Sequence, residues 1–111
     1  PQLIGRSAAM EAILTAEPIP APRAYELGLV SRLVEPGGAL DTALALAETI
    51  CANAPLAVWE SRQVVLAAAY EDEATLRRLT DEGFGRVLVS EDTKEGLTAF
   101  IEKRPPQWKG R

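Results

Sequence analysis

Apolar residues recur at helical spacing along this sequence, and proline or glycine interrupts almost every apolar stretch. This pattern predicts amphipathic helices that are separated by sharp turns. The alternation of apolar and polar residues that is typical of a half-buried strand is scarce, and 29–34 contains the only plausible strand. The sequence therefore predicts a mostly α chain with five or six helices and at most one short strand.

The N-terminal third predicts two short helices and a connector. Ser7 is positioned to cap the first helix, which ends before a proline-rich segment. Pro20 and Pro22 suit the first turn of a second helix, because proline lacks only an N–H that has no partner there. Gly28 is expected to cap the C-terminal end of that helix. Residues 29–34 then form either an extended connector or an edge strand.

Four longer helices are predicted over 39–54, 56–69, 73–89 and 91–103. Pro55 lies at or near the first position of the second of these, and Ser90 is the expected cap of the last. Gly83 and Gly85 either weaken the third helix or allow another backbone to approach it closely. Two prolines stop the last helix, and a polar tail around Trp108 follows.

The composition excludes several kinds of chemistry. The 111 residues contain no histidine, so imidazole bases and histidine metal sites are excluded, and no metal site is expected. The single Cys51 allows no internal disulfide, which favours a reducing, cytoplasmic setting. A net charge of −4 does not favour a nucleic-acid partner. No apolar run is long enough for a transmembrane helix, so no membrane partner is expected.

Few residues suggest a reaction by themselves. Acidic clusters at 71–73 and 91–95 lie at predicted helix starts, where acidic residues favour the helix dipole. Lys103 closes the last helix, where it can either bind a phosphate or remain solvated. Phe84 and Phe100 have the spacing of core residues. Trp108 is expected to be a packing anchor or an interface residue.

Four phrases in series resemble the C-terminal portion of the enoyl-CoA hydratase/isomerase (crotonase) family. They are LIGRSAAMEAILTAEPI, AYELGLVSRLVEPGGAL, ANAPLAV and SEDTKEGLTAFIEKRPPQWKGR. Together they extend from Leu3 to Arg111, in the order and spacing of the family. The last phrase is the most specific. The chain also starts at PQLIGR, without an initiator methionine or a signal-peptide profile, so we expect it to be a processed form or a fragment.

The resemblance implies the helical region of a crotonase-like α/β fold. Residues 1–38 would end the core of that fold and provide connecting helices, and residues 39–111 would form the C-terminal helical oligomerisation region. The intact protein would add water to the 2,3-double bond of an enoyl-CoA, without a cofactor. In this family the oxyanion-hole amides and the catalytic glutamates lie upstream, so we expect no catalytic residue in this chain and no activity of the chain alone. A homotrimer or hexamer is implied.

The resemblance also implies three substrate-binding residues. Phe84, Phe100 and Lys103 fall at family positions that enclose the acyl and nucleotide parts of acyl-CoA. For the two phenylalanines this favours the lining of a pocket or an interface over simple core packing. Two alternatives stay open. The intact protein can perform another crotonase-family reaction, as an isomerase, hydrolase, dehalogenase or decarboxylase, or the chain can be a non-catalytic helical assembly module.

Overall fold

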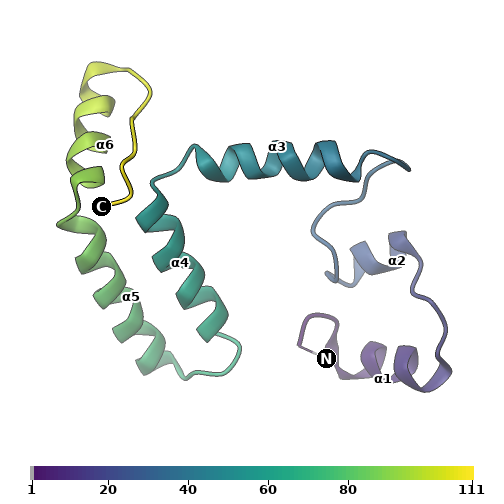
Figure 1. The fold of residues 1–111 in the computed structure, drawn as a ribbon. Helices are drawn as coiled ribbons and strands as arrows, with labels where there is room; N and C mark the ends of the chain where they lie inside the picture. The colour runs from purple at the N-terminus through teal and green to yellow at the C-terminus, as the bar shows by residue number, and fades with distance from the viewer. Residues whose placement is uncertain (1) are drawn as a thin grey trace. The chain divides into compact units, whose positions relative to one another are not determined.

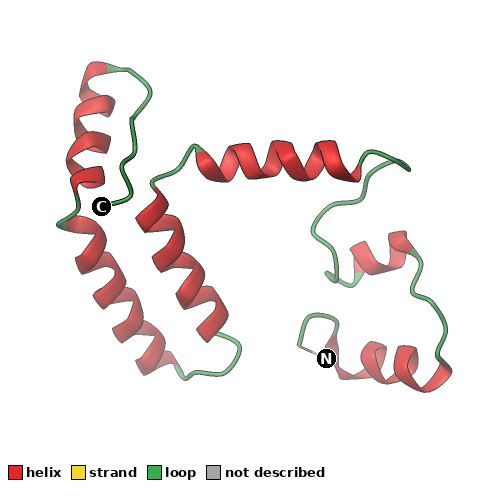
Figure 2. Cartoon of the chain, viewed as in Figure 1, coloured by secondary structure: helices red, strands yellow, loops and turns green. Residues whose placement is uncertain are grey.

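Six helices account for the regular structure of residues 2–111. The computed structural model describes residues 2–111, and within that range it contains no strand (Figures 1 and 2). The helices are α1 (Gly5–Thr15), α2 (Ala21–Glu26), α3 (Ala39–Cys51), α4 (Pro55–Ala67), α5 (Glu73–Leu88) and α6 (Glu91–Glu102). The mostly α prediction is confirmed. Residues 29–34 form the connector rather than the edge strand.

The chain forms two compact units, and the division between them lies inside α3. One unit ends at Ala43, and the other spans Leu44–Arg111. The sequence placed a boundary between residues 38 and 39, at the start of the same helix. The oligomerisation role predicted for 39–111 stays a prediction.

The N-terminal unit contains α1 and α2, and its turns follow the proline and glycine positions. The predicted Ser7 cap is wrong, because α1 begins two residues earlier, with Ile4 at the cap position and no side-chain cap bond. Gly28 follows α2 with a φ of +74°, a conformation that glycine adopts without strain. The N–H of Leu29 donates to the carbonyl oxygen of Ala24 at 2.8 Å, which closes the end of α2.

In the C-terminal unit, α4 and α5 lie side by side (Figure 1). Pro55 is the first residue of α4, as predicted, and Asp72 caps α5 by accepting from the N–H of Thr75 at 2.7 Å. A Cβ atom at Gly83 would lie 3.3 Å from the Cβ atom of Glu60 on α4, so glycine permits the close approach here. No neighbouring atom lies within 4 Å of the same position at Gly85.

The buried apolar residues of the described chain are all small. Ala9, Ala24 and Ala99 are buried, whereas most large apolar side chains on the helices are exposed. On α6 alone, Leu97 is 62% exposed and Ile101 is 77% exposed. The apolar stripes that the sequence predicts are therefore present on the helices but are not covered within this chain.

Candidate functional site

The three predicted substrate-binding residues lie on two neighbouring elements of the C-terminal unit. Phe84 is on α5, Phe100 is on the last turn of α6, and Lys103 follows α6 directly. Phe84 is 62% exposed and Phe100 is 83% exposed, so neither ring is packed in a core formed by residues 2–111. Their place in a pocket or an interface stays a prediction.

Phe84 lines a groove between α4 and α5. Neither Phe100 nor Lys103 is among the residues that line it, so the groove does not bring the three predicted residues together. Arg86 on α5 donates two hydrogen bonds of 2.7 Å to the carboxylate of Glu60 on α4. These hydrogen bonds lower the pKa of Glu60. The groove is lined by Ala57, Glu60, Ser61, Val64, Thr80, Gly83, Phe84 and Val87.

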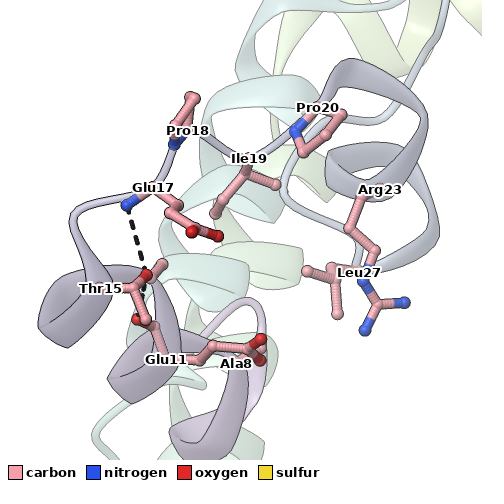
Figure 3. A pocket seen from close by; sticks show the side chains of 10 residues that line it. Ala8, Glu11, Thr15, Glu17, Pro18, Ile19, Pro20, Arg23 and Leu27 are labelled. Carbon is pink, nitrogen blue, oxygen red and sulfur yellow. Dashed lines mark hydrogen bonds between the residues drawn. The ribbon is translucent and has the colours of Figure 1, made fainter.

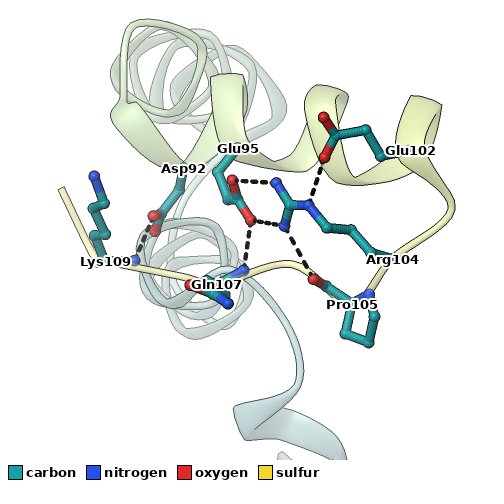
Figure 4. A network of polar contacts seen from close by, with 7 residues as sticks. All are labelled: Asp92, Glu95, Glu102, Arg104, Pro105, Gln107 and Lys109. Atoms are coloured by element: carbon teal, nitrogen blue, oxygen red, sulfur yellow. Dashed lines mark hydrogen bonds and ion pairs between the residues drawn. The ribbon is translucent and has the colours of Figure 1, made fainter.

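The chain folds back along α6 after the helix ends, and Asp92 holds the returning segment (Figures 1 and 4). Ser90 caps α6 as predicted, since its Oγ accepts from the N–H of Thr93 at 3.1 Å. Asp92 is only 2% exposed, and its two carboxylate oxygens accept from the N–H groups of Lys109 and Gly110 at 2.6 and 2.9 Å. A carboxylate matches two adjacent N–H donors because it only accepts hydrogen bonds.

A second carboxylate, Glu95, holds the turn that follows α6 (Figure 4). Arg104 donates to both oxygens of Glu95, at 2.6 and 3.0 Å, and to Glu102 at 2.6 Å. The backbone N–H of Gln107 donates to Glu95 at 2.7 Å. The guanidinium of Arg104, and then the Gln107 N–H, stabilise the ionised carboxylate and lower the pKa of Glu95 to about 2.

Trp108 fastens the returning segment to the rest of the unit. Its Nε1–H donates to the carbonyl oxygen of Ala52 at 2.8 Å, so the packing-anchor alternative is confirmed. A Cβ atom at Gly96 would lie 3.2 Å from the ring, so the absence of a side chain on α6 makes room for the indole. This role of Gly96 and the tail contacts of Asp92 and Glu95 were not predicted from the sequence. A glycine inside a predicted helix was the one signal available.

A shallow pocket in the N-terminal unit lies between α1 and α2 (Figure 3). Thr15 donates to the carbonyl oxygen of Glu11 at 2.9 Å and accepts from the N–H of Glu17 at 3.3 Å, so its hydroxyl has structural partners. Arg23 forms an exposed ion pair with Glu26 at 3.1 Å. The pocket is lined by Ala8, Glu11, Ala12, Thr15, Glu17, Pro18, Ile19, Pro20, Arg23 and Leu27. Nothing in this arrangement activates a nucleophile.

The pKa shifts of the carboxyl groups indicate structural roles rather than acid–base catalysis. A catalytic acid at neutral pH needs a raised pKa. Where the pKa of a carboxyl group is displaced, at Glu60, Asp72, Glu91 and Glu95, the displacement is downward. Residues 2–111 contain no group of three or more acidic or cysteine side chains that could hold a metal ion.

No single helix within residues 2–111 is long and apolar enough to cross a membrane. Ala39–Cys51 and Pro55–Ala67 reach that length and apolarity only as a pair, which is bent by 111°.

Comparisons with known proteins point to one family. The family model for enoyl-CoA hydratase/isomerase matches residues 1–111. A short-chain-enoyl-CoA hydratase of Clostridium acetobutylicum is 40% identical over 103 residues, which are 93% of this chain and 40% of the relative. A carnitinyl-CoA dehydratase of Proteus mirabilis is 36% identical over 91% of this chain and 40% of its own length.

Solved structures agree with the sequence comparisons. An enoyl-CoA hydratase from Mycobacterium tuberculosis H37Rv superposes on this chain with a TM-score of 0.93 and 44% identity. The match covers 100% of this chain and 44% of the solved chain. The chain therefore spans about two fifths of the length of the proteins that it matches.

Proposed function

Because this chain belongs to the enoyl-CoA hydratase/isomerase family, we propose that the enzyme containing residues 1–111 adds water across the 2,3-double bond of an enoyl-CoA thioester. The observation that carries the proposal is the 40% identity to a short-chain-enoyl-CoA hydratase along 93% of the chain. The reaction would serve fatty-acid or related acyl-CoA metabolism. The single Cys51 fits a reducing, cytoplasmic setting.

The proposed reaction requires only water and two proton movements, and no cofactor. The oxygen of water bonds to C3 of the enoyl group, the thioester becomes an enolate, and C2 then takes a proton. Two N–H donors aimed at the enolate oxygen and a carboxylate that activates water would supply this chemistry. Asp92 and Glu95 are already engaged by the returning tail, so neither is free to act as that carboxylate. We assign the catalytic groups to the part of the enzyme outside residues 1–111.

Residues 1–111 are proposed to contribute contacts to the substrate. Lys103 is exposed, and none of the ion pairs within residues 2–111 involves it, so its ammonium group is available for a phosphate of CoA. The exposed rings of Phe84 and Phe100 offer apolar surface to the rest of acyl-CoA or to a neighbouring subunit.

The exposed apolar stripes support assembly. Exposed apolar patches of this extent mark surfaces that another protein surface covers. We propose that these stripes are covered by the rest of the enzyme and by neighbouring subunits in a homotrimer or hexamer. Light scattering of the full-length enzyme during size-exclusion chromatography tests the assembly, and a monomer at micromolar concentration would contradict it.

The hydration of crotonyl-CoA tests the function. The full-length enzyme should consume crotonyl-CoA, whereas residues 1–111 alone should not, and turnover by the 111-residue chain would contradict the assignment of catalysis elsewhere. Lys103→Ala in the full-length enzyme should raise KM for crotonyl-CoA and make it less sensitive to salt. Lys94→Ala is the matched control, since Lys94 is also exposed and also lies outside the ion pairs of residues 2–111.

A second reaction of the same family is kept because of the carnitinyl-CoA dehydratase relative. Its name indicates the removal of water from a CoA thioester that carries a cationic acyl group. Assays with crotonyl-CoA and carnitinyl-CoA side by side distinguish the two substrates. A kcat/KM at least tenfold higher for carnitinyl-CoA would replace the first proposal.

A further inference from the structure

Lys103 has an unusual backbone conformation for a residue with a side chain. Its φ of +55° and ψ of +39° place it in the left-handed region at the end of α6. Residues other than glycine occupy this region only where the surrounding structure holds them there. Here the N–H of Arg104 donates to the carbonyl oxygen of Ala99 at 3.1 Å, which fixes the chain reversal around Lys103.

Side-chain contacts hold the residues before and after Lys103 in the sequence, and Figure 4 shows these contacts for Glu102 and Arg104. Glu102 and Arg104, its two neighbours in sequence, are ion-paired to each other at 2.6 Å. Arg104 also pairs with Glu95, one of the less exposed charged groups of the unit, with 20% of its side chain exposed. Glu95 accepts a further hydrogen bond from the N–H of Gln107, beyond the turn. Glu95 therefore joins α6 to both Arg104 and the tail.

These contacts separate the roles of two adjacent cations. The guanidinium of Arg104 is occupied by two carboxylates and by the carbonyl oxygen of Pro105 at 3.2 Å. The ammonium group of Lys103 forms no ion pair within residues 2–111. A cation held on a fixed backbone loses less freedom on binding an anion than one on a mobile segment.

We propose that Glu95 is a positioning residue, which acts through Arg104 and the N–H of Gln107 to hold the turn that presents Lys103 to a phosphate of CoA. The proposal rests on the proposed function, because it assumes that Lys103 meets CoA. Loss of the Glu95 charge removes the ion pair that ties Arg104 to α6, so the turn at Lys103 is held less firmly from the helix side, while Asp92 and Trp108 still hold the rest of the tail. The amine of Lys103 remains present, but binding of the phosphate then costs the conformational entropy that is lost when the turn and the lysine become ordered.

The test measures dissociation constants of the full-length enzyme for CoA and for pantetheine, which lacks the nucleotide and its phosphates. Glu95→Gln keeps an acceptor for the N–H of Gln107 but removes the charge that pairs with Arg104. This variant should bind CoA about fivefold more weakly, as expected when one exposed charge contact loses most of its strength. Its affinity for pantetheine and its kcat with saturating crotonyl-CoA should not change. Glu73→Gln, which breaks an exposed ion pair of 2.6 Å on α5, should change neither affinity.

A double variant separates positioning from an independent contribution. Lys103→Ala combined with Glu95→Gln should bind CoA no more weakly than Lys103→Ala alone, because Glu95 acts only through Lys103. Additive losses would overturn the proposal. Equal weakening of CoA and pantetheine, or a lower kcat, would indicate a general disturbance of the fold and would also overturn it.

The two proposals fail in different ways. If Lys103→Ala weakens CoA binding but Glu95→Gln does not, positioning by Glu95 is refuted and the proposed function stands. If both variants weaken CoA binding without additivity while the enzyme fails to hydrate crotonyl-CoA, the reaction is refuted and positioning stands. An enzyme that does not bind CoA refutes both.

Discussion

Replacing single helix glycines by alanine compares the same chemical change in two different surroundings. Gly83 and Gly85 flank Phe84 on α5. Inside a helix, alanine is about 0.8–1 kcal/mol more favourable than glycine in the free energy of helix formation. At Gly85 the new methyl group meets no atom within 4 Å, so this gain is expected in full. Gly85→Ala should raise the free energy of unfolding by about 1 kcal/mol.

At Gly83 the same methyl group would meet α4. It would lie 3.2 Å from Oε2 and 3.3 Å from Cβ of Glu60. The Cβ atom is fixed to the backbone of α4, so relief requires the two helices to move apart and the contacts of Glu60 with Arg86 to adjust. Overpacking of this kind costs about 1–3 kcal/mol, which equals or exceeds the helix gain. Gly83→Ala should therefore be about 1–3 kcal/mol less stable than Gly85→Ala.

Urea unfolding followed by circular dichroism measures both variants against the parent protein. The comparison is valid where the dependence of the unfolding free energy on urea is the same for all three proteins. If Gly83→Ala is as stable as Gly85→Ala, then the close approach of α4 and α5 at this point does not limit the side chain, and the reasoning is refuted.

Three further outcomes concern the end of α6 and the tail. Ser90→Ala removes the helix cap and should lower the unfolding free energy by about 1 kcal/mol, measured by urea unfolding, while Ser90→Asp should restore most of it. The pairing with Arg104 lowers the pKa of Glu95 from its ordinary value of 4.5 to about 2, so the contribution of Glu95 to stability is present above pH 4.5 and is lost as the pH falls through 2. A side-chain titration by NMR with a midpoint near 4.5 would contradict this pairing. Trp108→Phe keeps an aromatic ring but removes the N–H that donates to Ala52, and faster hydrogen exchange of the tail amides should follow; unchanged exchange would show that ring packing alone holds the tail.

The helices could be predicted from sequence because their ends carry local signals. Pro55 and Ser90 act within one turn of their own positions, and both were located correctly. The predicted Ser7 cap was wrong because several residues near the start of a helix can form its boundary. The preference of serine for a cap position does not by itself select among them.

The contacts of the tail could not be predicted, because they depend on where the chain returns in space. Asp92 has the sequence position of an ordinary acidic residue in a first helical turn, and its partners lie 17 and 18 residues later. The exposure of Phe84 and Phe100 could not be predicted from their spacing either. Helical periodicity identifies an apolar face but does not show what covers that face. The family resemblance, and not the residue pattern, pointed away from core packing.

The hydrogen bond from the indole N–H of Trp108 to the carbonyl oxygen of Ala52 has a consequence for the order of folding. Most contacts of the tail join residues fewer than 20 positions apart, whereas this one joins residues 56 positions apart. The entropy lost on closing a loop rises with its length, so the local contacts form at lower cost and the distant one is expected to form later. The indole of Trp108 would then report the final closure of the segment from Ala52 to the tail, as a fluorescence change that follows the gain of helix signal.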